Sequence, residues 1–303
     1  MSDSTRVLFD APGPRARMRY RILAVVGTLL VLAIAYVVYT RLDEKNQLTA
    51  ARWDWILTSS AWNNYLIPGL WDTLRAAAIS IVLAMILALV LAMARMSEIA
   101  PLRWVAGVVV EFFRAVPVLI MMLFVFWFLA HRGWFPDSLN PMIGVVVGLV
   151  MYNASVLCEV IRNGVASLPA GQREAGLSIG LSPAQVRRSI LIPQSLTAML
   201  PTLISQIIVI TKDTALGYLI LYPELVTRGR QLGSAEVATL PAYVVVGLIF
   251  IVINYTLSKI AEAIENRQRR RGHTAGPVAH AEEPAVQVPI GTRAGISTFN
   301  TST

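Results

Sequence analysis

Charged residues lie within apolar stretches of this chain, and two pairs of them share one spacing. Glu111 with Arg114, and Glu159 with Arg162, each form an E-x-x-R unit. Residues three apart on a helix share a face, so each carboxylate can reach its guanidinium. Two chemistries fit this arrangement. One is ion pairing that neutralises charge and locks helices together, and the other is a polar lining for the path of a zwitterionic solute.

A third charged unit, Lys212-Asp213, interrupts another apolar run. Adjacent residues on a helix point in different directions, so these two cannot simply pair with each other. Either each finds a partner on another helix, with Asn153, Glu159 and Asn254 as candidates, or the helix opens there and exposes backbone to a cavity. Structural pairing and path lining both remain open. The candidate path residues are therefore Glu111, Arg114, Asn153, Glu159, Arg162, Lys212 and Asp213.

The sequence shows no arrangement of residues suited to catalysis. His131 is expected in a loop, two further histidines lie near the C-terminus, and the one cysteine, Cys158, lies in an apolar run. Nothing places a nucleophile beside a base or gathers metal ligands. The sequence also has no G-x-x-x-x-G-K-[ST] motif for binding ATP. We therefore expect neither an enzyme nor a cofactor or metal site.

A polar segment, Gly171–Pro193, lies between two apolar runs. Gly180 is placed to end a first short helix in a left-handed conformation. Ser182 then caps a second helix, with Gln185 closing a capping box, and Pro193 must bend or stop that helix. The pattern predicts a pair of short helices at the membrane surface. An ordinary structured loop between membrane helices is the simpler alternative.

The elements that position these residues are membrane spans. The chain has 303 residues, of which 55% are hydrophobic, too many for a soluble domain of this size. We expect an all-α polytopic membrane protein with about six transmembrane helices. The first apolar run is expected to be a retained helix, because it is too long for a signal peptide and lacks a small-x-small site. The runs long enough to span hydrocarbon are Ile22–Thr40, Ala76–Ala94, Trp104–Ala130, Ser138–Cys158, Leu196–Ile220 and Val237–Ser258.

Basic residues flank these runs unevenly. Sixteen Lys and Arg fall on the side of the two termini and the 171–193 segment, against six on the other side. The positive-inside rule places that first side in the cytoplasm. The net charge of +8 therefore comes from basic residues that flank membrane spans, and it does not indicate nucleic-acid binding. We divide the chain into a disordered cytoplasmic segment (1–19), a first helix with an outer loop (20–68), a membrane core (69–265) containing the loop 169–193, and a basic flank with a disordered tail (266–303).

The polar segment also carries a recognisable motif. Glu174-Ala175-Gly176, three residues, Gly180, nine residues and then Ile190–Pro193 resembles the EAA signature of ABC-importer permease subunits. That signature runs E-A-A, three residues, G, nine residues, I-x-L-P. Gly176 and Ile192 are the departures, and Gly176 weakens its helix by about 1 kcal/mol relative to Ala.

Other segments resemble the polar amino-acid branch of that family, most of all the glutamate-type permeases of actinobacteria. These segments occur in the family's order and cover about two-thirds of the chain. They are Gly69–Leu74 (G-L-x-x-T-L), Glu111–Pro117 (E-x-x-R-x-x-P), Glu159–Gly164 (E-x-x-R-x-G), Pro169–Glu174 (P-x-G-Q-x-E) and Lys212–Leu216 (K-D-T-S-L, with Ala for Ser).

The resemblance implies a type I importer permease with a five-helix core and an N-terminal helix. Two permease subunits would form the path, and we expect the second subunit to be a homologue of this chain in preference to a copy of it. A dimer of separate ATPase subunits would bind in the cytoplasm. An extracytoplasmic amino-acid-binding protein would deliver glutamate or another polar amino acid. The ATPase-coupling residues implied are Glu174, Ala175, Gly176, Gly180 and Pro193. We expect Arg187 and Arg188 to meet lipid phosphates or solvent.

Three rival classes are compatible with a membrane chain of this kind. A secondary transporter driven by an ion gradient normally needs more spans and internal repeats. A non-catalytic subunit for another small polar solute would share the present features. A membrane enzyme should show paired His or carboxylates at the interface. A test of whether transport depends on ATP separates the secondary transporter and the membrane enzyme from the ATP-driven importer.

Overall fold

The computed structural model describes residues 13–272, and within that range the regular secondary structure is helical. Five helices are long and apolar enough to cross a membrane, or six if one bent pair counts as a span. This confirms the predicted all-α membrane fold. The five are Pro14–Glu44 (α1), Ser59–Arg95 (which includes α2, Ser59–Ala61, and α3, Ile67–Arg95), Asn140–Ala166 (α6), Leu200–Ile220 (which begins with α10, Leu200–Asp213) and Thr239–Ile264 (within α12, Thr239–Gly272).

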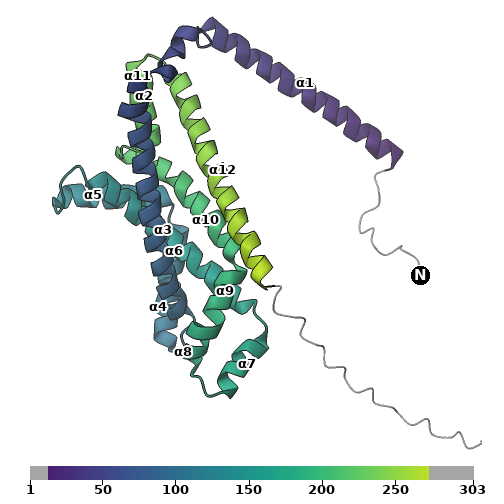
Figure 1. Ribbon diagram of the computed structural model, residues 1–303, viewed down its shortest axis with the longest axis vertical. Coiled ribbons are helices and arrows are strands. Elements are labelled where there is room, and N and C mark those ends of the chain that lie inside the picture. The colour runs from purple at the N-terminus through teal and green to yellow at the C-terminus, as the bar shows by residue number, and fades with distance from the viewer. Residues whose placement is uncertain (1–12, 273–303) are drawn as a thin grey trace, which may run out of the picture.

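The third predicted span is not a continuous helix. It divides into α4 (Ala100–Ala115) and α5 (Val118–Arg132), which meet at 98°. The break follows from Pro117, because a proline disfavours helical geometry in the residue before it. Val116 is accordingly extended, with φ −80° and ψ 127°. In Figure 1, α5 projects sideways from the bundle while α4 runs beside its lower end.

Small residues hold the centre of the bundle together. Ala84, Ala88 and Ala92 follow one another at four-residue intervals along α3, and all three are fully buried. They share a packed cluster with residues of α6, including Ala154 and Cys158. Membrane helices associate through such small side chains because lipid supplies little hydrophobic drive between them. The pair α3 and α6 is thus the frame that carries Glu159 and Arg162 and against which α4 packs with Glu111 and Arg114.

Helix α1 stands away from this frame (Figure 1), and none of its described residues is buried. It begins at Pro14, where a proline suits the first helical turn. It therefore includes residues 14–19, for which we expected disorder. The expectations for residues 1–12 and for the tail 273–303 fall outside the described residues.

The elements at the two ends of the bundle complete the structure. Short helices α7 (Ala170–Ser178), α8 (Pro183–Val186) and α9 (Ile192–Ala198) form the lower end in Figure 1, and α11 (Leu225–Ala235) lies at the upper end. The lower end therefore contains the predicted polar segment.

Candidate functional site: a helical hairpin and a charge network

The polar segment folds into a hairpin of short helices, as its sequence predicts. Gly180 has φ +85°, a conformation that favours glycine. Its N–H donates to the Leu177 carbonyl at 3.0 Å, and the Leu181 N–H donates to the Gly176 carbonyl at 3.2 Å. These two bonds form a Schellman motif, which satisfies the last carbonyls of α7. The direction of the turn is thereby set by local backbone chemistry.

The second helix begins with the predicted capping box. The Ser182 N–H donates to Gln185 Oε1 at 2.8 Å, and the Gln185 N–H donates to Ser182 Oγ. Contrary to one alternative we considered, the helix does not stop at Pro193. A π-helical turn, Arg187–Leu191, precedes the proline, and α9 continues to Ala198. A π-helical turn of this kind is one of the common ways in which a helix continues past a residue, such as proline, that breaks its regular hydrogen bonds.

Gly176 is the buried residue of the predicted coupling set. A Cβ atom there would lie 2.9 Å from side-chain atoms of both Ile190 and Val186. The departure from the EAA pattern therefore lets α7 approach the second helical segment closely. Glu174 and Ala175 face outward and are exposed. The Glu174 carboxylate accepts no hydrogen bond from any described residue, so it is available to an external group.

The hairpin is anchored to the end of α6. A Cβ at Gly164 would lie 2.3 Å from Ser195 Oγ, and that hydroxyl donates to the Ile161 carbonyl at 3.0 Å. Gln194 Nε2 also donates to Gln172 Oε1 at 3.0 Å, which ties α9 to α7. The glycine of the E-x-x-R-x-G segment thus marks a close helix crossing.

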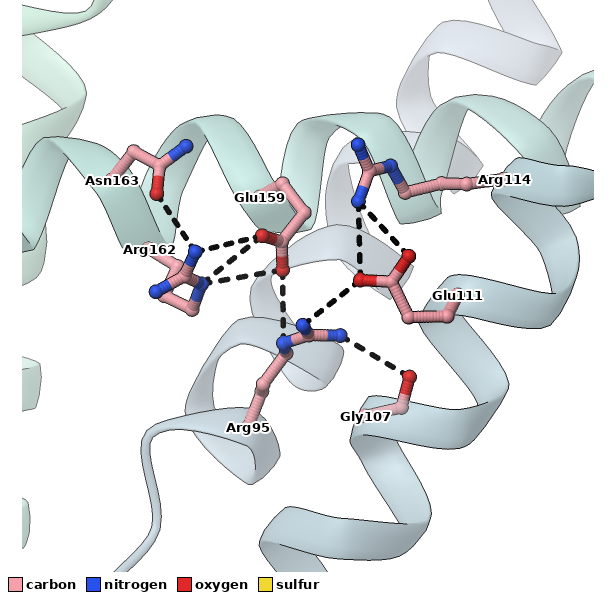
Figure 2. A network of polar contacts seen from close by, with 7 residues as sticks. All are labelled: Arg95, Gly107, Glu111, Arg114, Glu159, Arg162 and Asn163. Carbon is pink, nitrogen blue, oxygen red and sulfur yellow. Dashed lines mark hydrogen bonds and ion pairs between the residues drawn. The ribbon is translucent and has the colours of Figure 1, made fainter.

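Both E-x-x-R units form ion pairs, and a fifth residue joins them. Arg114 lies 3.2 Å from Glu111, and Arg162 lies 2.9 Å from Glu159. Arg95, the last residue of α3, contacts both carboxylates, at 3.1 Å to Glu111 and 2.9 Å to Glu159 (Figure 2). Three arginines and two glutamates give this network an excess of one positive charge.

Arg95 is not among the predicted path residues, because it is one of the sixteen basic residues that the positive-inside count assigns to the cytoplasmic side. Its Nη1 also donates to the Gly107 carbonyl, so it contacts α4 at two places. The sequence signal was available: Arg95 directly follows an apolar run of membrane length. Only the packing of α3 against α4 and α6 shows that its side chain points toward Glu111 and Glu159 (Figure 2).

A cavity of about 560 Å³ adjoins the network. Its polar lining includes Glu111, Arg114, Tyr152, Glu159 and Asn163. Both faces of the cavity therefore carry charged or hydrogen-bonding groups within a membrane segment, where they can meet a polar solute.

The third charged unit has a different environment. The α-helical part of its span ends at Asp213, and a 3-10 helix, Thr214–Ile220, follows. Among the described residues, neither Lys212 nor Asp213 has an ion-pair or hydrogen-bond partner for its side chain. The structure thus shows the helix changing form at this point.

The partners we considered for that unit are engaged elsewhere. Asn153 accepts a hydrogen bond from Gln206 Nε2 at 2.6 Å, Glu159 belongs to the charge network, and Asn254 donates to the Phe250 carbonyl. Among the described residues, none of these three pairs with Lys212 or Asp213.

A buried carboxyl outside the predicted set lies at the start of α11. Glu224 accepts hydrogen bonds from the Val226 N–H, the Thr227 N–H and the Thr227 hydroxyl, at 2.7, 2.7 and 2.9 Å. Burial raises the pKa of Glu224 to about 7, although these hydrogen bonds favour its charged form. The N–H of Leu225, the residue directly after Glu224, donates to Thr73 Oγ1. The start of α11 is thereby fixed against α3.

Membrane-length helices that enclose a charged cavity and carry an exposed hairpin are an arrangement suited to the membrane subunit of a transporter. Residues 80–270 match the family described as "Binding-protein-dependent transport system inner membrane component". The chain belongs to this family.

Its relatives include amino-acid permeases. The chain is 46% identical over 231 residues to the "Glutamate transport system permease protein GluD" of Corynebacterium glutamicum, which covers 76% of this chain and 84% of the relative. It is 32% identical to the "L-cystine transport system permease protein TcyB" of Bacillus subtilis, over 73% of this chain and 93% of the relative. A crystal structure of an amino acid ABC transporter with histidines superposes with a TM-score of 0.61 and 28% identity, covering 67% of this chain and 93% of that chain.

Proposed function

We propose that this chain forms half of the translocation path of an ATP-driven importer for glutamate or a related polar amino acid. The family and the names of the similar permeases support the transport of amino acids. The single observation that carries the coupling part is the exposed carboxylate of Glu174, which has no partner within residues 13–272, on a hairpin with a locally determined shape.

The hairpin α7–α8 is the docking element for a separate ATPase. Glu174 would meet a basic or polar group on that partner. The side chain of Ile179 is 76% exposed, and Leu177 is also exposed, so the same short helix and its C-cap offer apolar side chains as well as the charge. Exposed apolar side chains grouped in this way are typical of protein contact sites. Gly180 and Pro193 act by shaping the hairpin, and Ala175 by allowing close approach.

The remaining partners follow from the family. The ATPase would be a dimer of separate chains, since the sequence lacks a P-loop. A second permease subunit, a homologue in preference to a copy, would supply the other half of the path, and an extracytoplasmic amino-acid-binding protein would deliver the substrate. The positive-inside count supports cytoplasmic placement of both termini and of the hairpin.

The charged cavity is the proposed path lining on this subunit. A zwitterionic or acidic amino acid carries at least one carboxylate, and the network has one positive charge in excess. Arg114 lines the cavity and can offer further N–H groups beyond its bond to Glu111. Lys212 and Asp213 are proposed to line a second part of the path, because the helix changes form beside them. Asn153 is fully buried and bonded to Gln206 and to the Leu149 carbonyl, so its proposed part is to hold α6 against α10 beside the path.

The test is uptake and ATP hydrolysis by the assembled importer in proteoliposomes. Glu174→Lys and Gly180→Val should leave substrate delivery by the binding protein intact but uncouple ATP hydrolysis from uptake. Glu262→Lys is the control, because Glu262 is another exposed glutamate, located near the end of α12. Its ion pair with Lys259 is exposed and contributes little, so this variant should transport normally. Normal uptake by both hairpin variants would refute the docking role.

A further inference from the structure

Arg187 does not face lipid or solvent as expected. Its Nη1 lies 2.8 Å from Glu98 Oε1, and its side chain is only 13% exposed. Glu98 lies in the turn between α3 and α4, 89 positions away in the sequence. Among the described residues, this is the ion pair that joins the hairpin segment to another part of the chain.

The same short turn also carries the central residue of the charge network. Arg95 is three residues before Glu98, and it contacts Glu111 on α4 and Glu159 on α6. Residues of this one turn therefore form two sets of ion pairs, with different parts of the chain. One set reaches the hairpin, and the other reaches both helices that line the charged cavity.

The turn itself is held by short-range hydrogen bonds. The Ser97 N–H donates to the Ala94 carbonyl, and the Ile99 N–H donates to Ser97 Oγ at 3.2 Å. Arg103 from α4 donates to the Ser97 carbonyl at 3.0 Å. These hydrogen bonds connect Glu98 to Arg95 through one short, ordered segment.

We propose that the α3–α4 turn, residues 95–99, is a mechanical link between the ATPase-docking hairpin and the charged cavity, with Glu98 and Arg187 as positioning residues for energy coupling. Neither residue touches substrate or nucleotide. Their ion pair sets where the hairpin lies relative to Arg95, and thereby relative to Glu111 and Glu159. This inference rests on the proposed function.

The geometry favours a link over a mere surface contact. Arg187 Nε is buried without a hydrogen-bond partner, so the guanidinium is removed from water and depends on Glu98. The Glu98 carboxylate is 61% exposed, so water screens the pair and its contribution to stability is small. Its role is to hold the shielded guanidinium of Arg187 in position. The neighbouring Arg188 is exposed and provides a control of the same residue type.

The experiment is a double-mutant cycle in the reconstituted importer with its ATPase and binding protein. The measured quantity is the number of amino-acid molecules taken up per ATP hydrolysed. Glu98→Gln and Arg187→Gln should each lower this ratio about fivefold, within the range found for residues that carry coupling between sites. The double variant should lose no more than either single variant, because both remove one interaction.

Two further variants separate positioning from folding. The exchange Glu98→Arg with Arg187→Glu should restore at least half of the wild-type ratio, and Arg187→Lys should stay near it. Arg188→Gln should match the wild type. Unchanged ratios in both single variants, losses that multiply in the double variant, or no recovery in the exchange would each overturn the link.

The failure of this link is distinct from the failure of the proposed function. If Glu174→Lys uncouples the importer while both Gln variants keep the wild-type ratio, the hairpin docks the ATPase and only the link is wrong. If the wild-type assembly shows no ATP-dependent uptake, the proposed function itself is wrong.

Discussion

Arg95 offers a quantitative test, because it contacts two carboxylates in different environments. Its side chain is 18% exposed and lies 2.9 Å from Glu159, which is 11% exposed, and 3.1 Å from Glu111, which is 59% exposed. The two distances are similar, so the difference in solvent screening decides which contact is stronger. The contact with Glu159 should dominate.

Replacement of Arg95 by Gln removes both contacts at once. Loss of one partner from a buried pair costs about 3–5 kcal/mol when the other charge is left alone. Glu159 keeps Arg162 at 2.9 Å, and Glu111 keeps Arg114, so we expect the smaller loss of about 2 kcal/mol in the free energy of unfolding. A double-mutant cycle with Glu159→Gln should give a coupling energy of about 2 kcal/mol, and one with Glu111→Gln a value below about 1 kcal/mol.

The assay is reversible unfolding of the purified permease in mixed detergent micelles, followed by circular dichroism for each variant of both cycles. Equal coupling energies for the two glutamates, or a larger value for Glu111, would refute the argument that shielding from water sets the order. An Arg95→Gln variant as stable as the wild type would refute the central place of Arg95 in the network.

Three other outcomes follow from particular contacts. Gly164→Ala should lower the free energy of unfolding by about 1–3 kcal/mol through overpacking against Ser195, whereas Gly171→Ala, which meets no atom within 4 Å, should show no loss in the same detergent titration. Gly180→Ala should strain a backbone with φ +85° by about 1–2 kcal/mol, which proteolysis of the hairpin in native membranes should detect as faster cleavage. Burial raises the pKa of Glu224 to about 7 from an ordinary value of 4.5, so the folded state holds this proton to higher pH than the unfolded state. The stability contributed by this proton is lost as the pH rises from about 4.5 to about 7, and Glu224→Gln should show a weaker fall in unfolding free energy across that window. An equally steep fall in that variant would contradict the assignment.

The hairpin was predictable in detail because its interactions are local. The Schellman motif at Gly180 and the capping box of Ser182 and Gln185 join residues at most five positions apart. The ion pairs of the two E-x-x-R units are local in the same sense. Residue type and spacing are sufficient for such contacts, without knowledge of the tertiary fold.

The features that the sequence did not predict depend on contacts between distant parts of the chain, or on a proline within an apolar run. The pair of Glu98 and Arg187, and the contacts of Arg95, arise only once α3 packs beside α4, α6 and the hairpin. The break at Pro117 has a sequence signal in the proline itself, but the apolar run continues across it from Trp104 to Ala130. The surroundings of Lys212 likewise depend on where its helix changes form.

Uptake by proteoliposomes that contain this permease, its ATPase and its binding protein tests the central claim most directly. Labelled glutamate should accumulate only when ATP is present on the side of the ATPase, and an imposed proton or sodium gradient should not replace ATP. Accumulation driven by an ion gradient in the absence of ATP would contradict the account and favour a secondary transporter.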